Sequence, residues 1–240
     1  MSILELAIIG GIASALSTSA GSLIAPIIHS TQKLRKYHLS MDFALGVMLS
    51  AVAFSLVGPE LLKGEHLSLA LSGLFLGIIF ILMTHKVISH FTKESQKSSQ
   101  YLLIAALIFH NLPEGMGAGA SLAGMELSQA IPLQVAIAIQ NVMEGLLLTL
   151  LLQNLGMSLF WSVMGGIASG LIEMSGAVSA GFILEQTKAL LPFLLTFAGG
   201  AMMMSVLQEL MESINLGRVL KVKHFVLGLL TIPVTNYLFS

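Results

Sequence analysis

Two short polar motifs interrupt the apolar middle of this sequence. The first reads HNLPEG over residues 110–115, and the second reads QNVMEG over residues 140–145, thirty positions further on. In an α-helix the first, second and fifth residues of each motif would share one face, because positions one and four apart lie within an arc of roughly 100°. Turned toward each other, the two faces would gather nitrogen and oxygen donors from His110, Asn111, Glu114, Gln140, Asn141 and Glu144. Such a set of donors favours a bound cation.

Carboxyl groups also occur where an apolar environment makes them costly. Of the twelve acidic residues, Glu114, Glu144 and Glu173 lie deep inside apolar stretches, and no lysine or arginine lies at a comparable depth. These three residues must therefore be protonated, bound to a metal, or open to a water-filled path. Each of these states indicates transport of cations or protons. The alternative is that the acids only hydrogen-bond the helices together. Such hydrogen bonds would offset little of the free-energy cost of burying the carboxyl groups.

The kinds of donor narrow the choice of cation. An imidazole nitrogen from His110, amide oxygens and carboxylates together suit a borderline divalent metal better than Na⁺ or K⁺. His110 stands one helical turn from Glu114 on the same face, which favours a ligand over an isolated core histidine. Pro113 should free a backbone carbonyl and bend the first helix beside the site, whereas Met143 in the second motif predicts a straighter helix.

The composition places these motifs in a membrane protein. The chain has 240 residues, of which 55% are hydrophobic and only 10% are charged, a profile typical of a polytopic membrane protein. The absence of cysteine excludes disulfides, thiolate metal sites and cysteine nucleophiles. We find no phosphate loop, dinucleotide fingerprint or basic aromatic surface, and therefore expect no organic cofactor and no nucleic-acid partner. The N-terminus carries no basic residue ahead of its apolar stretch, so we interpret it as a first span rather than a cleaved signal.

The apolar stretches predict an all-α fold with eight transmembrane helices in a single domain over residues 1–240. Their expected limits are 3–28, 41–62, 67–88, 101–124, 129–153, 157–184, 190–213 and 222–239. Very short connections force neighbouring spans to run antiparallel. Nine of the eleven basic residues follow the first, third and seventh spans, and only Lys63 and Lys188 fall on the other side. The positive-inside rule then makes the nine-residue side cytoplasmic and places both termini outside.

At this point the sequence resembles the ZIP family of divalent metal transporters. The resemblance rests on the two motifs, on GVMLS at residues 46–50, on LIEMSG around Glu173, and on AGGAMMMSVLQEL in the seventh span. It implies two metals bridged by Glu114 and Glu144. The first would bind Met48, His110, Glu114, Gln140 and Glu144, and the second would bind Asn111, Glu114, Asn141, Glu144 and Glu173. Asn141 stands where the family often has aspartate, so the second site carries less negative charge and should bind more weakly.

The resemblance also implies a function and a mechanism. The chain would be a secondary transporter, not an enzyme, that moves Zn²⁺, or else Fe²⁺, Mn²⁺ or Cd²⁺, into the cytoplasm by alternating access. The first, fourth, fifth and sixth spans would move against the others, with inverted three-helix repeats around the central pair. A bacterial inner membrane is the expected location, and a homodimer is a possible assembly.

Two other functions stay open from the residues alone. A passive channel or a proton-coupled exporter could use the same ligands. An intramembrane metal-dependent hydrolase would need a fixed general base, typically in a His-Glu-x-x-His motif, and no such motif occurs in the sequence.

Further polar residues lie nearer the ends of the spans. Glu60 and His66 would lie at the outer ends of the second and third spans, where they could gather cations. Gln208, Glu209 and Glu212 would lie toward the inner end of the seventh span and could form an exit route. The alternative for all five is ordinary interfacial polarity, because acids and histidines near helix ends cost little.

Overall fold

The computed structural model describes residues 1–29, 37–92, 98–215 and 219–239, and all regular structure within them is helical. Long apolar stretches fold this way because a helix satisfies its own backbone hydrogen bonds inside a bilayer. The all-α prediction is therefore confirmed. The helices are α1 (Ile3–His29), α2 (Tyr37–Ala51), η2 (Val52–Leu56), α3 (Gly58–Lys63), α4 (Leu67–Thr92), α5 (Ser98–Gly124), α6 (Leu127–Asn154), α7 (Leu159–Gln186), η3 (Lys188–Leu190), α8 (Leu191–Asn215), α9 (Val222–Leu229) and α10 (Thr231–Phe239).

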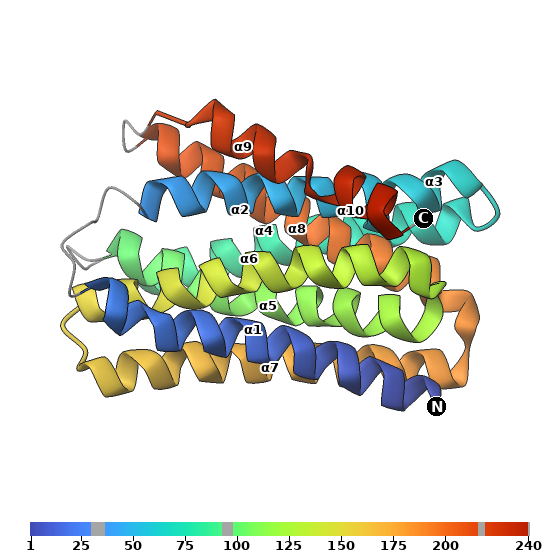
Figure 1. The fold of residues 1–240 in the computed structure, drawn as a ribbon, viewed down its shortest axis with the longest axis horizontal. Coiled ribbons are helices and arrows are strands. Elements are labelled where there is room, and N and C mark those ends of the chain that lie inside the picture. The colour runs from blue at the N-terminus through green and yellow to red at the C-terminus, as the bar shows by residue number, and fades with distance from the viewer. Residues whose placement is uncertain (30–36, 93–97, 216–218, 240) are drawn as a thin grey trace.

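In the described part of the chain these helices make eight passes along the long axis of the molecule (Figure 1). The second pass combines α2, the π-helical segment η2 and α3, and the last combines α9 and α10. Among the described residues, six helices are long and apolar enough to cross a membrane by length and composition. Both termini lie at the same end of the molecule, together with α3, as eight antiparallel passes require.

The last pass is broken, where the apolar pattern predicts one helix. Its two pieces are only 8 and 9 residues long, and they meet at Leu230. Ser50 of α2 bridges the break, since its hydroxyl donates to the carbonyl of Leu229 at 2.8 Å and accepts from the amide of Ile232 at 3.3 Å. These bonds satisfy backbone groups that a helix end would otherwise leave without partners.

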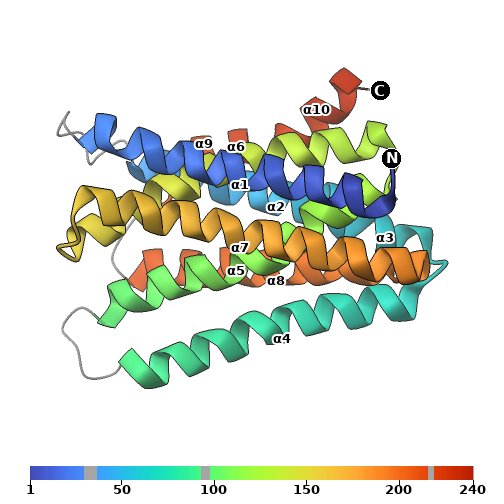
Figure 2. The same ribbon diagram turned by 90° about the horizontal axis from the view of Figure 1, so that it is seen from below.

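The helices form two groups. In one group α1, α5, α6 and α7 all pack against one another, and we call this the four-helix bundle. In the other group α4 packs against α8, and α2 packs against α9. The two groups meet where α5 contacts α8 and α4, and where α6 contacts α2 and α10. Figure 2 shows α4 at the edge of the molecule, beyond α5 and α8.

The glycine that ends each polar motif allows the four-helix bundle to pack closely. A Cβ atom on Gly115 of α5 would lie 1.9 Å from the backbone oxygen of Glu173 on α7. A Cβ atom on Gly145 of α6 would lie 1.9 Å from the backbone oxygen of Thr18 on α1. Only glycine permits these approaches, which place the backbones of α7 and α1 directly beside the two motifs.

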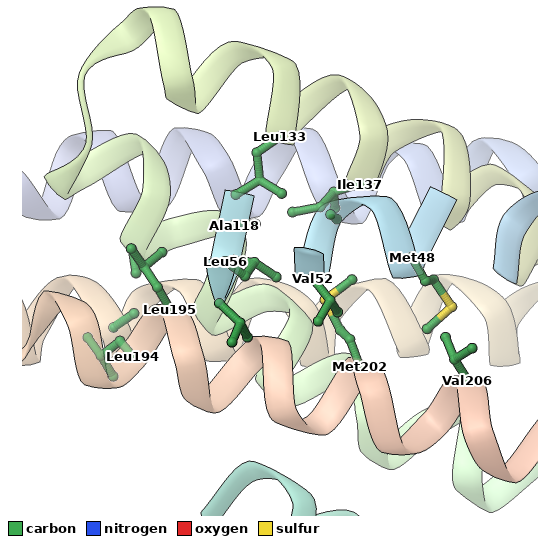
Figure 3. Close-up of a cluster of buried hydrophobic side chains, with 14 of the residues drawn as sticks. Met48, Val52, Leu56, Ala118, Leu133, Ile137, Leu194, Leu195, Met202 and Val206 are labelled. Atoms are coloured by element: carbon green, nitrogen blue, oxygen red, sulfur yellow. The ribbon is translucent and has the colours of Figure 1, made fainter. Parts of the chain in front are cut away.

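A cluster of buried apolar side chains fills the space between the two groups (Figure 3). We call it the apolar seam, and its labelled members are Met48, Val52, Leu56, Ala118, Leu133, Ile137, Leu194, Leu195, Met202 and Val206. Ala118 follows Glu114 along α5, and Leu133 and Ile137 precede Gln140 along the antiparallel α6. These three residues therefore lie on the side of the polar motifs that faces the termini, and the seam covers the motifs from that end.

Candidate metal site

The two motifs lie halfway along α5 and α6, and their predicted ligand residues are all buried. Glu114, Gln140, Asn141 and Glu173 have 0% of their surface exposed. The packing of α5 against α6 and α7 brings the three helices together at this depth. The structure therefore gathers seven of the eight predicted metal ligands, which are His110, Asn111, Glu114, Gln140, Asn141, Glu144 and Glu173.

Four of these residues form one group, which we call the ligand cluster: His110, Glu114, Gln140 and Glu144. Nε2 of His110 lies 3.1 Å from Oε2 of Glu144. Nε2 of Gln140 donates to Oε1 of Glu114 at 2.7 Å and to Oε1 of Glu144 at 3.0 Å. One donor atom each from His110, Glu114 and Glu144 lies within 4.8 Å of the other two, a spacing that could hold a metal ion.

The second group surrounds Glu173 on α7. Oε1 of its carboxylate accepts hydrogen bonds from Oγ1 of Thr18 at 2.5 Å and from Nδ2 of Asn111 at 2.9 Å. Oε2 accepts from Oγ of Ser14 at 2.6 Å and from Nδ2 of Asn141 at 2.7 Å. Each carboxylate oxygen thus receives one hydroxyl group and one amide group. These contacts involve α1, α5, α6 and α7, so the network belongs entirely to the four-helix bundle.

Several buried oxygen atoms of the site have no hydrogen-bond partner. They belong to the three amide side chains and to one carboxylate: Asn111 Oδ1, Gln140 Oε1, Asn141 Oδ1 and Glu114 Oε2. A buried polar atom without a partner is costly, so such an atom is a place for an ion, a water molecule or another ligand. All four atoms are electron-pair donors of the kind that binds divalent cations.

Hydroxyl groups of the site were not predicted from the sequence. Ser14 and Thr18 of α1 bind Glu173, and Ser169 of α7 accepts a hydrogen bond from Nδ2 of Asn111 at 2.7 Å. The available signal was spacing, because residues 14 and 18 are four apart and share a helix face. That signal is weak, since serine and threonine in membrane helices also bond to their own backbone, as Ser17 does to the carbonyl of Ala13 at 2.8 Å.

The remaining predicted residues lie elsewhere. Met48 is buried in the apolar seam beside Val206, and its role as a ligand stays a prediction (Figure 3). Glu60 is buried on α3 and forms an ion pair of 2.7 Å with Lys63, which lowers its capacity to attract a cation. His66 is exposed in the turn before α4.

The candidate exit residues follow one another along α8. Gln208 and Glu209 are half-buried there. Glu212 lies one turn further along α8, and its side chain is outside the described part of the structure. The part of these residues in an exit route stays a prediction.

Burial differs slightly among the members of the ligand cluster. His110 and Glu144 retain 6% and 8% of their surface, whereas Glu114 and Gln140 have none. His110 and Glu144 lie farther from the apolar seam along α5 and α6 than Glu114 and Gln140 do. His110 and Glu144 are thus the least completely buried members of the cluster.

Comparison with known proteins identifies similar chains. The zinc transporter ZIPB of Bordetella bronchiseptica is 33% identical over 224 residues, which cover 85% of this chain and 71% of the relative. The zinc transporter GufA of Myxococcus xanthus is 30% identical over 226 residues, which cover 87% of this chain and 89% of the relative. A putative zinc transporter of Arabidopsis thaliana is 30% identical over 182 residues, which cover 70% of this chain but only 28% of that longer protein. No protein-family model matches the chain.

Proposed function

The chain belongs to the ZIP family of divalent metal transporters, and we propose that its own cargo is Zn²⁺, moved across a bacterial inner membrane toward the cytoplasm. It is an integral membrane protein and a transporter rather than an enzyme. Our proposal concerns the cargo, the direction of transport and the residues that bind the metal. The observation that carries them is the buried group of His110, Glu114 and Glu144, whose donor atoms lie within 4.8 Å of one another.

The ligand cluster supports Zn²⁺ through its charge and donor types. Two carboxylates from Glu114 and Glu144 would neutralise a divalent ion in a region where uncompensated charge is costly. The imidazole of His110 adds a nitrogen donor, which Zn²⁺ accepts readily and which Mg²⁺ or Ca²⁺ binds less well. The relatives that share most of this chain are named as zinc transporters.

Binding requires Gln140 to turn. Its amide nitrogen now lies between Glu114 and Glu144, at 2.7 Å and 3.0 Å, where it supplies hydrogen to both carboxylates. A cation that bridges these carboxylates would take over that role and repel the amide hydrogens. A rotation of the amide group would then direct Oε1, which is buried without a hydrogen-bond partner, toward the ion.

The arrangement of the helices supports alternating access. All hydrogen bonds described for the site join helices of the four-helix bundle, so a bound metal would travel with that bundle. The apolar seam separates the bundle from α2 and α8 and covers the site on one side. Movement of the bundle past these helices would expose the site toward the termini and cover it at the other end. The positive-inside rule makes the end of the molecule away from the termini cytoplasmic.

Metal entry into sealed vesicles of defined orientation tests the proposal. We expect external Zn²⁺ to reach an indicator trapped inside, and we expect Glu144→Ala to reduce the initial rate at least about tenfold, since it removes a charged ligand. Glu185→Ala is the matched control, because Glu185 is exposed near the end of α7. Undiminished uptake by Glu144→Ala at equal expression would remove the ligand cluster from the transport route. Preferred uptake of Mn²⁺ or Cd²⁺ over Zn²⁺ would show that the cargo is a different metal, and the proposed metal site would stand.

A further inference from the structure

We propose that an apolar groove between α4, α5 and α8 binds one acyl chain of an anionic phospholipid. The groove has a volume of about 540 Å³, and we call it the lipid groove. Seven residues of α4 between Leu76 and Ile88 line it, together with Phe109 of α5 and Phe197 of α8. The inference goes beyond the proposed function, because it concerns a lipid and not the metal. Only the assignment to the cytoplasmic leaflet rests on the orientation given above.

The lipid groove forms where the close packing of α4 against α8 ends. A Cβ atom on Gly73 of α4 would lie 2.4 Å from the backbone oxygen of Phe193, and one on Gly77 would lie 2.1 Å from that of Phe197. Small residues of this kind let two membrane helices approach closely. One turn later the ring of Phe80 meets the ring of Phe197, with 5.8 Å between the ring centroids. These bulky rings require more space than glycine, and the groove lies beside them.

The lining of the lipid groove suits a hydrocarbon chain. Thr84 is the polar side chain in the lining, and its hydroxyl already donates to the backbone carbonyl of Phe80 at 2.8 Å. A polar ligand would therefore gain no hydrogen bond from another lining side chain. Met83 and Phe109 are about half-exposed, and dispersion contacts with a flexible chain would cover them. The groove thus favours an acyl chain over a metal ion or a polar molecule.

The length of the lipid groove matches one leaflet of the bilayer. Leu76 and Ile88 are twelve residues apart on α4, which corresponds to about 18 Å along the helix axis. One leaflet contributes roughly 15 Å of hydrocarbon, half of the apolar core. Ile88 lies near the end of α4 at Thr92, on the side of the molecule away from the termini. The chain would therefore enter from the cytoplasmic leaflet, with its headgroup near the end of α4.

The charge at that end of α4 favours an anionic headgroup. Lys86 and His90 are exposed there, four residues apart on one helix face, and Lys86 directly precedes the lining residue Val87. The sequence of α4 contains no aspartate or glutamate. A lysine near the end of a span extends its ammonium group to the membrane surface, where it attracts anionic lipids. The apolar groove and the basic residues thus lie in the order of an acyl chain and its phosphate.

Labelling with a phosphatidylglycerol that carries a diazirine on its acyl chain tests the site. In purified full-length protein in detergent, we expect the label on peptides that contain residues 76–88. Met83→Trp should lose most of this labelling, because the larger side chain would fill the lipid groove. Leu82→Trp is the matched control, since Leu82 is exposed at the same depth of α4 and is not a lining residue. Equal labelling of the two variants would overturn the inference, as would even labelling of all lipid-facing helices in the wild type.

Competition with unlabelled lipids tests the headgroup. Phosphatidylglycerol should displace the label about fivefold better than phosphatidylcholine, since a lysine near the surface favours an anionic lipid. Lys86→Gln should remove this preference. Lys188→Gln should keep it, because Lys188 is exposed in η3, at the other end of the molecule. Equal displacement by the two lipids in the wild type would overturn the assignment of an anionic lipid.

A second copy of this chain is the competing occupant of the lipid groove. Native mass spectrometry of the wild type should show bound phosphatidylglycerol, and Met83→Trp should show less. A lipid-free dimer that Met83→Trp separates into monomers would overturn the inference in favour of a protein interface. None of these measurements involves a metal, so their failure would leave the proposed function intact. A labelled groove in a protein that takes up no Zn²⁺ would overturn the proposed function alone.

Discussion

Nε2 of His110 on α5 lies 3.1 Å from Oε2 of Glu144 on α6, so the two polar motifs touch across the interface of their helices. This contact pairs the two side chains directly. A metal would replace it, because the imidazole lone pair and the carboxylate would both turn to the ion. Metal binding should therefore change the distance between α5 and α6.

Removing the imidazole should change the choice of metal. We expect His110→Ala to lower Zn²⁺ affinity by roughly 10–100-fold and Mn²⁺ affinity by less, because nitrogen donors favour Zn²⁺ over the harder Mn²⁺. Competition between the two metals during vesicle uptake measures this ratio. His66→Ala serves as the control, since His66 is exposed in the turn before α4. An unaltered preference would exclude His110 as a ligand.

Acid should weaken metal binding. The carboxylates and the imidazole of the ligand cluster bind a metal only when they carry no proton there, so protons and metal compete for the same atoms. We expect the apparent Zn²⁺ affinity to fall at least tenfold from about pH 7.5 to about pH 5.5, at a constant free Zn²⁺ concentration. Equal affinity at both pH values would contradict a site built from these groups.

Gly115→Ala should destabilise the protein by about 1–3 kcal/mol, as overpacking usually does. The added Cβ would lie 1.9 Å from the backbone oxygen of Glu173, so α5 and α7 must separate. Thermal unfolding in detergent measures the loss. Gly165→Ala is the control, because its Cβ would meet only the side chain of Leu152. Similar unfolding temperatures for the two variants would show that the close approach at Gly115 contributes little.

Asn141→Asp should make stability depend more strongly on metal. An aspartate cannot donate to Glu173 or Ser14, and it would place a second carboxylate where Nδ2 now lies 2.7 Å from Glu173. We expect the metal-free variant to unfold at a lower temperature than the wild type. Added Zn²⁺ should then raise its unfolding temperature more than it raises that of the wild type, because a cation relieves the repulsion. Equal increases in unfolding temperature with Zn²⁺ would show that Asn141 does not interact with the metal.

The sequence was sufficient to predict the membrane spans and the meeting of the two motifs. Run length and hydropathy determine a spanning helix, and the spacing of Asn111 and Glu114 determines their shared face. The contacts of Glu173 could not be predicted in the same way. Which helix faces Ser14 and Thr18 depends on close packing between distant segments, and periodicity within one helix carries no such information. The break at Leu230 escaped prediction for the same reason, since the hydroxyl of Ser50 that bridges it comes from α2.

The apolar seam has a consequence for the speed of the transporter. Its side chains, among them Leu56, Leu133 and Met202, interact through non-directional contacts. Such contacts can be exchanged for others at a new register without leaving a buried donor or acceptor unpaired. The four-helix bundle can therefore slide along the apolar seam against a low activation barrier, while the hydrogen bonds inside the bundle stay intact.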